Sequence, residues 1–297
     1  MLLKNMASIT ELIKQLRAST QAGFMDCKKA LEATNNDIDQ AIKWLRENGI
    51  AKAAKKVDNV ASEGVIKLKL ADQKATILEI NSQTDFVTKN DQFVAFSNEL
   101  VDLVHKHETT DVAKIEQLKL ASGSTVAETQ IHLTAIIGEK ISLRRVAFVK
   151  EEANSSLATY LHSNSRIGVI VKTSKTDDKE FLKHLAMHIA ASNPKFVSQK
   201  DVSADFIAKE REIAAAQAQS ENKPKEFIDR IVDGRINKVL EEVCLVNQKF
   251  LVNQEQTVQQ AAQAKKVEIL SFIRYEVGEG IEKQVSNFAD EVKAQMK

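Results

Sequence analysis

The spacing of the hydrophobic residues changes after Gly64, and this change most restricts what the chain can fold into. Before Gly64, apolar side chains recur every three or four positions, as they do on one face of a helix. Residues 65–70 and 75–80 then follow a period of two, which is typical of strands. The short polar connection 71–74 between them predicts a β-hairpin. The chain therefore joins helical and strand segments in series, which indicates an α+β protein.

The first fifty residues predict a compact unit of three short helices. Gly23 interrupts the helical spacing once, and the polar turn 35–37 interrupts it again. We expect the unit to close at Gly49 and the lysines of residues 52–56 to lie on a solvated basic linker helix. A phosphate-binding patch is the alternative interpretation of these lysines. The apolar positions that define the three helices are Ile9, Leu12, Ile13, Leu16, Cys27, Ala30, Leu31, Ile38, Ala41, Ile42 and Leu45.

The decapeptide after the hairpin, NSQTDFVTKN at residues 81–90, places Phe86 among polar and turn-forming residues. Apolar side chains outside regular elements usually fold back into the core, and this is one interpretation of Phe86. The alternative is that Phe86 is exposed for contact with another protein. A helix is predicted to begin near Asn90 or Asp91. Its apolar face consists of Phe93, Phe96, Leu100, Val101 and Val104.

A similar order of elements returns later in the chain. Residues 157–162 and 166–172 predict two strands, and the apolar stripe within residues 181–189 predicts a helix after them. We therefore expect two hairpin-plus-helix halves of one duplicated core. Residues 141–149 and 267–273 can supply further strands.

A long helical segment lies between these predicted strands. Two helices within residues 203–243, joined near residues 219–224, predict an antiparallel helical hairpin that projects from the core. Such an arm is a plausible contact surface for a second protein, and a local helix pair that caps the sheet is the alternative. A last helix is expected at residues 281–293.

Composition limits the functions that the chain can have. Its 42 basic and 41 acidic residues leave a net charge of +1, which supplies no general attraction to nucleic acid or to a membrane. The two cysteines, Cys27 and Cys244, lie far apart and lack the spacing of a disulfide scaffold or zinc site. No export signal or membrane-spanning run is recognisable. We expect a cytoplasmic protein with no direct nucleic-acid partner and no membrane partner.

Motifs for nucleotide or catalytic chemistry are absent from the sequence. It has no GxxxxGK[ST] phosphate loop, no GxGxxG and no GxSxG, so we expect no cofactor and no triad hydrolase. Gly278-Glu279-Gly280 is interpreted as a turn and helix start. His184 and His188 share a helix face and could hold a metal ion, but Leu185 stands where a zincin has its catalytic Glu. A metal-dependent enzyme is therefore the alternative function.

Five motifs together resemble bacterial elongation factor Ts. The resemblance is colinear, covers the chain from Met6 onward, and leaves residues 1–5 before the usual start of the family. The motifs are TQAGFMDCKKALEATNNDIDQAIKWLRENG (20–49), QTDFV (83–87), YLHSNSRIGVIV (160–171), HIAASNPKFV (188–197) and FIRYEVGEGIEK (272–283).

The resemblance implies a guanine nucleotide exchange factor in translation elongation, which performs no covalent chemistry. Its partner would be elongation factor Tu, in the GDP-bound and nucleotide-free states. Self-association into a homodimer or heterotetramer through the helical hairpin is left open. The implied domains are 6–57, a ubiquitin-associated-like unit that docks on the GTPase; 58–150, the amino-terminal half of the core; 151–279, the carboxy-terminal half, with the hairpin at about 203–243; and 280–297, a carboxy-terminal helical module.

The resemblance also assigns site residues. Thr84, Asp85, Phe86 and Val87 would form the loop that enters elongation factor Tu, with Asp85 and Phe86 near its magnesium and phosphate site. His162 would contact the carboxy-terminal part of Tu, although residues 163–165 lack the glycine often found there. On the bare sequence, Asp85 could instead bond a turn N–H, Phe86 could be core, and His162 could be an unpartnered strand-end residue.

Overall fold

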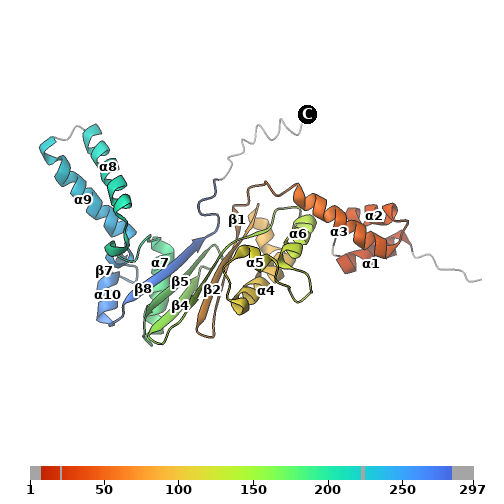
Figure 1. Cartoon of the computed structure of the whole chain (residues 1–297), viewed down its shortest axis with the longest axis horizontal. Coiled ribbons are helices and arrows are strands. Elements are labelled where there is room, and N and C mark those ends of the chain that lie inside the picture. The colour runs from red at the N-terminus through yellow and green to blue at the C-terminus, as the bar shows by residue number, and fades with distance from the viewer. Residues whose placement is uncertain (1–7, 21, 222–224, 283–297) are drawn as a thin grey trace, which may run out of the picture. The chain divides into compact units, whose positions relative to one another are not determined.

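The computed structural model describes residues 8–20, 22–221 and 225–282, with the side chains of residues 225 and 226 excepted (Figure 1). Contacts divide the chain into two compact units. Among the described residues, the first contains 8–67, 78–146 and 277–282, with residue 21 excepted, and the second contains 68–77 and 147–276, with residues 222–224 excepted. The boundaries between the units fall within strands β1 (Glu63–Ala71), β2 (Lys74–Ser82) and β3 (Ser142–Lys150) and at the end of strand β8 (Ile269–Glu276).

The first unit begins with the three predicted helices, α1 (Ile9–Thr20), α2 (Phe24–Ala33) and α3 (Ile38–Ala54). Asp37 caps the start of α3, because its carboxylate accepts a hydrogen bond from the backbone N–H of Gln40 and so satisfies a free donor of the first turn. The apolar stripes of the helices meet in one cluster. Its buried members are Ile13, Leu16, Ala22, Cys27, Ala30, Leu31 and Ala41.

The prediction that this unit closes at Gly49 is wrong. Helix α3 continues through Gly49 to Ala54. The glycine has a packing role there, since it allows a close approach between α3 and a second helix. A Cβ atom at Gly49 would lie 3.3 Å from the Cβ of Ala135 on α6 (Val126–Ile137). The expected linker helix is thus the last part of α3, where Lys52 forms a 2.6 Å ion pair with Asp26.

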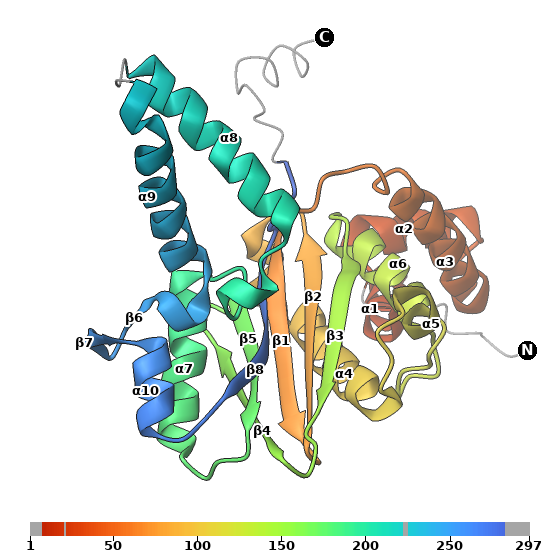
Figure 2. The same ribbon diagram turned by 60° about the vertical axis from the view of Figure 1, so that its left-hand side comes forward.

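The predicted hairpin is confirmed as β1 (Glu63–Ala71) and β2 (Lys74–Ser82). Asp72 and Gln73 connect the strands with positive φ angles of 49° and 58°, the conformation that two-residue hairpin turns require. Strand β3 (Ser142–Lys150) completes a sheet of order β1-β2-β3. The predicted helix α4 (Asp91–His107) packs on this sheet through a cluster that includes Leu78, Ile80, Phe93, Leu100 and Val104 (Figures 1 and 2). A short helix, α5 (Val112–Glu116), precedes α6.

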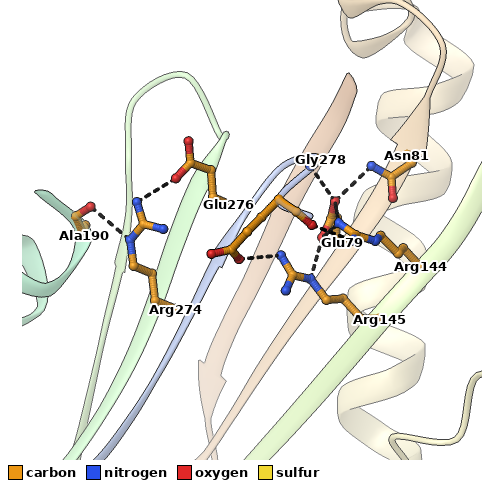
Figure 3. A network of polar contacts seen from close by, with 9 residues as sticks. Glu79, Asn81, Arg144, Arg145, Ala190, Arg274, Glu276 and Gly278 are labelled. Carbon is orange, nitrogen blue, oxygen red and sulfur yellow. Dashed lines mark hydrogen bonds and ion pairs between the residues drawn. The ribbon is translucent and has the colours of Figure 1, made fainter. Parts of the chain in front are cut away.

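A buried carboxylate joins the last described residues to this sheet (Figure 3). The Glu79 side chain is fully buried and accepts hydrogen bonds from Arg144, Arg145, Asn81 and the backbone N–H of Gly278. Burial alone would raise the pKa of Glu79, but the Gly278, Asn81 and arginine contacts outweigh it and lower the pKa below its ordinary value. This network holds the turn at residues 277–280 in place.

Gly278 can be only glycine in this turn. Its φ angle is +76°, and a Cβ atom there would lie 2.2 Å from the backbone oxygen of Ser62. The predicted turn at residues 278–280 is therefore confirmed. Residues 281 and 282, where the last helix is predicted to begin, have no helical structure. The rest of the predicted helix at 281–293 and most of the module at 280–297 lie outside the described residues.

The second unit contains an antiparallel sheet of order β4-β5-β8. Helix α7 packs on it through a cluster that includes Val169, Val171, Phe181, Leu185 and Ile189. The predicted strands and helix are thus present, and a hairpin followed by a helix occurs twice in the chain. Duplication of the core remains a prediction. The elements are β4 (Ser155–Leu161), β5 (Ile167–Ser174), α7 (Lys179–Ser192) and β8 (Ile269–Glu276).

Helices α8 (Ala204–Ser220) and α9 (Lys225–Val243) form the predicted helical hairpin and lie side by side in both views (Figures 1 and 2). Arg211 and Asp233 pair between them at 2.6 Å, and Arg235 pairs with Glu221 at 2.8 Å. Smaller elements complete the unit, namely η2 (Gln199–Asp201), η3 (Leu245–Asn247), β6 (Lys249–Phe250), β7 (Asn253–Thr257) and α10 (Val258–Ala264). Within the described ranges, the structure contains no helix with the length and apolar character needed to cross a membrane.

Candidate functional site

The loop after β2 forms a short 3-10 helix, η1 (Asp85–Lys89), that separates two neighbouring apolar side chains. Val87 is 3% exposed and packs into the core beneath α4. Phe86 is 78% exposed, the largest exposed fraction among the large hydrophobic side chains of the described residues. The interpretation of Phe86 as a core residue is therefore wrong. A large aromatic side chain left in water is available for burial against a partner, and aromatic side chains are frequent among the residues that dominate binding energy.

Thr84, the residue before η1, is held by hydrogen bonds to two other residues. The backbone N–H and the hydroxyl of Thr84 both donate to the carboxylate of Glu139, each at 2.7 Å. The hydroxyl of Ser82 donates to the backbone oxygen of Thr84 at 2.8 Å. Inside the turn, the Thr88 hydroxyl donates to the backbone oxygen of Asp85 at 2.6 Å. These contacts fix the backbone on either side of Phe86.

Two further side chains hold the ends of the loop, and each accepts two hydrogen bonds. The side-chain oxygen of Gln83 accepts from the backbone N–H of Lys140 at 2.9 Å and from the side-chain amide of Asn59 at 3.2 Å. At the other end, the Asn90 side chain accepts from the N–H groups of Gln92 and Phe93 and so caps α4. Contacts within its own unit thus hold the loop at both ends.

The side chain of Asp85 is exposed beside Phe86. The described residues offer its carboxylate no hydrogen-bond or ion-pair partner, so the interpretation of Asp85 as a turn-bonding residue has no support. An anionic side chain and an aromatic side chain are therefore both exposed at the tip of one turn.

A shallow hollow lies between α1 and the start of α4, the helix that follows the loop. It has a volume of about 410 Å³ and is lined by Lys14, Arg17, Ala18 and Gln92. The two cationic side chains would favour an acidic group on any surface that covers this part of the molecule.

His162 lies in the second unit, in the turn between β4 and β5, and its side chain is exposed. Its ring nitrogen Nδ1 is 3.0 Å from the hydroxyl of Tyr160. The His162 backbone closes the turn, because its N–H donates to Ile167 and its oxygen accepts from the N–H of Ser165. Ser165 has a φ angle of +56°, a left-handed conformation that glycine adopts more easily. The chain thus forms a tight turn here with a serine in the left-handed position.

His184 and His188 do not form a metal centre in this arrangement. Nδ1 of the buried His188 accepts a hydrogen bond from the N–H of Leu251 at 3.2 Å. That bond leaves the proton on Nε2, which lies 2.9 Å from the side-chain oxygen of Gln248. Neither ring nitrogen then offers a free lone pair to a metal. The described part of the chain also holds no group of three or more His, Cys, Asp or Glu side chains that could bind a metal.

Sequence reasoning found the loop but missed the residue that holds it. Glu139 is 55 positions from Thr84, so no local pattern links the two residues. The one available signal was Gly138, which ends α6 with a φ angle of +85° and turns the chain so that Glu139 meets the loop.

Comparisons with known proteins agree with the family that the sequence motifs resemble. Residues 83–279, more than half of the chain, match the family described as Elongation factor TS. The chain is 45% identical to the Elongation factor Ts of Mycoplasma genitalium over 298 aligned positions, which cover 98% of this chain and 100% of that protein. A match of this extent cannot come from one shared motif. The chain belongs to the elongation factor Ts family.

Proposed function

We propose that this protein is the guanine nucleotide exchange factor of elongation factor Tu, and that the loop containing Thr84, Asp85, Phe86 and Val87 releases GDP from it. The observation that carries the proposal is the 78% exposure of Phe86 on a loop fixed at both ends. A fixed loop loses little conformational entropy on binding, so most of the burial energy of the aromatic ring remains for work on the partner.

In the proposed mechanism, Phe86 enters a pocket of Tu and displaces the segments that hold the magnesium ligands. Asp85 places a carboxylate where it competes with the phosphates for that cation and repels them. The contacts of Tu with magnesium and phosphate weaken, and GDP leaves. Because linkage is reciprocal, incoming GTP weakens the binding of the factor by the same free energy, and the factor dissociates.

A comparison of free energies indicates that burial of Phe86 alone would not account for GDP release. A ten-thousandfold acceleration of GDP release requires a barrier lower by about 5.5 kcal/mol. Complete burial of one large apolar side chain supplies about 1.5–3 kcal/mol. Other contacts must supply the difference.

We propose that these other contacts involve the first helices, His162 and the helical hairpin. In the three-helix unit at residues 6–57, Phe24 and Met25 of α2 are exposed, which supports docking on the GTPase. His162 is exposed in its turn and would contact a second part of Tu. Ile213 and Phe227 are exposed on the hairpin, which could bind Tu or a second copy of the chain.

The test is the dissociation rate of fluorescent GDP from elongation factor Tu, with a substoichiometric amount of this protein or of Phe86→Ala. We expect the wild-type protein to accelerate release catalytically and Phe86→Ala to do so about ten- to a hundredfold less, which corresponds to the burial energy of the ring. No acceleration by the wild-type protein with its cognate Tu would reject the function. Equal acceleration by both would place its origin outside the loop.

A further inference from the structure

The position of Phe86 depends on a carboxylate from a different part of the chain. Glu139 lies in the connection between α6 and β3, directly after the left-handed Gly138. Its side chain is half-buried, and its two oxygens receive the two donors of Thr84. One oxygen binds the backbone of the loop and the other binds a side chain, so the contact fixes both the position and the orientation of Thr84.

Thr84 is the N-cap residue of η1. It precedes Asp85, the first residue of η1, and has an extended backbone with φ −121° and ψ 161°. The change from extended to helical backbone therefore occurs at the residue that Glu139 holds. Val87, three residues later, is buried and holds the other side of the turn. Phe86 lies between these two attachments.

We propose that Glu139 is a positioning residue for nucleotide exchange, which holds Thr84 so that η1 keeps Phe86 directed outward. This inference rests on the proposed function. Glu139 touches neither nucleotide nor magnesium in this role and acts only through Thr84 and Phe86. Without it, the start of η1 loses its two charge-assisted hydrogen bonds, and the turn is free to rearrange so that Phe86 covers apolar surface of its own unit.

Two substitutions separate positioning from general stability. Glu139→Ala removes both acceptors. Glu139→Gln keeps an oxygen that accepts from the N–H of Thr84 and an amide that can donate to its hydroxyl, so this variant should retain the geometry. Glu99→Ala is the matched control, because the Glu99 carboxylate accepts a 2.6 Å hydrogen bond from the N–H of Ala121 in the same unit and, among the described residues, forms no hydrogen bond or ion pair with the loop.

The first readout is the GDP-release rate at increasing concentrations of each variant. We expect Glu139→Ala to lower the maximal rate by about tenfold, the equivalent of one charged hydrogen bond, with little change in the half-saturating concentration. Glu139→Gln should restore most of the rate, and Glu99→Ala should keep it. In the Phe86→Ala background, Glu139→Ala should cause no further loss. A full loss in that background would overturn the inference, because Glu139 would then act independently of Phe86.

The second readout does not depend on exchange activity. Backbone hydrogen exchange at residues 83–89 should become faster in Glu139→Ala, stay slow in Glu139→Gln, and be unchanged in Glu99→Ala. Unchanged protection of the loop in Glu139→Ala would overturn the positioning role even if the protein is an exchange factor. If the wild-type protein fails to accelerate GDP release, the proposed function and this role in exchange are both rejected, whereas faster hydrogen exchange in Glu139→Ala would still show that Glu139 holds the loop.

Discussion

Phe86 and Val87 are adjacent in the chain, yet their side chains are 78% and 3% exposed. The 3-10 turn directs one to solvent and the other into the core under α4. We therefore expect substitutions at these neighbouring positions to have different effects on binding and on stability.

Phe86→Ala should leave the fold intact while it impairs exchange. An exposed side chain contributes little to the folded state, so the free energy of unfolding should change by less than about 0.5 kcal/mol. Phe93→Ala, at a fully buried position of α4, should cost about 3–5 kcal/mol. Chemical denaturation of the two variants measures this difference. A large destabilisation by Phe86→Ala would mean that the ring packs against its own unit.

Asp85→Asn should slow GDP release by about tenfold and leave the unfolding free energy unchanged, because the substitution removes a charge that has no partner in the described residues. The control is Asp72→Asn in the β1–β2 turn, where Asn also tolerates the positive φ angle. Equal rates for Asp85→Asn and the wild-type protein would exclude an electrostatic role for this carboxylate.

Ser165→Gly should stabilise the turn that carries His162, or leave its stability unchanged, because glycine adopts a φ angle of +56° without a steric penalty. Ser165→Val should cost about 1–2 kcal/mol, since a branched side chain is strained in that conformation. Thermal unfolding of both variants tests this expectation. Destabilisation by Ser165→Gly would indicate that the serine side chain itself holds the turn.

Glu79 should make the protein sensitive to acid. Its pKa is lowered in the folded state, so the folded protein binds fewer protons than the unfolded chain as the pH falls. The stability that Glu79 contributes is complete above its ordinary pKa in the unfolded chain, about 4.3, and is lost as the pH falls below that value. Glu79→Gln should be less stable at pH 7, and its unfolding free energy should vary less between pH 5 and 3. Glu47→Gln, at an exposed position of α3, is the control and should keep the wild-type profile.

His188 should add a second pH dependence in a higher range. Burial lowers the pKa of its imidazole, only partly offset by the contact with Gln248. The unfolded chain therefore takes up the proton first, and the folded state loses stability as the pH falls below about 6.5. His188→Gln should flatten the unfolding free energy between pH 7 and 5. An unchanged profile for His188→Gln would contradict the buried neutral state.

Local patterns in the sequence predicted most of the elements. The change of period at Gly64 predicted the β1–β2 hairpin, and the polar residues around Asn90 predicted the start of α4. The two apolar stripes within residues 203–243 predicted the helical hairpin. These features depend on neighbours within a few positions. The motifs also indicated the family, because five colinear segments are specific together, and they marked the loop that we propose for nucleotide exchange.

Tertiary structure decided what the local pattern could not. A glycine usually weakens a helix, but Gly49 lies within α3 because Ala135, distant in the chain, needs the space. Phe86 had two interpretations until packing placed Val87, not Phe86, in the core. Thr84 and Glu139 have no sequence signal in common, since 55 residues separate them. Composition and period determine which residues can be buried, whereas contacts between distant segments determine which residues are buried and which remain available to a partner.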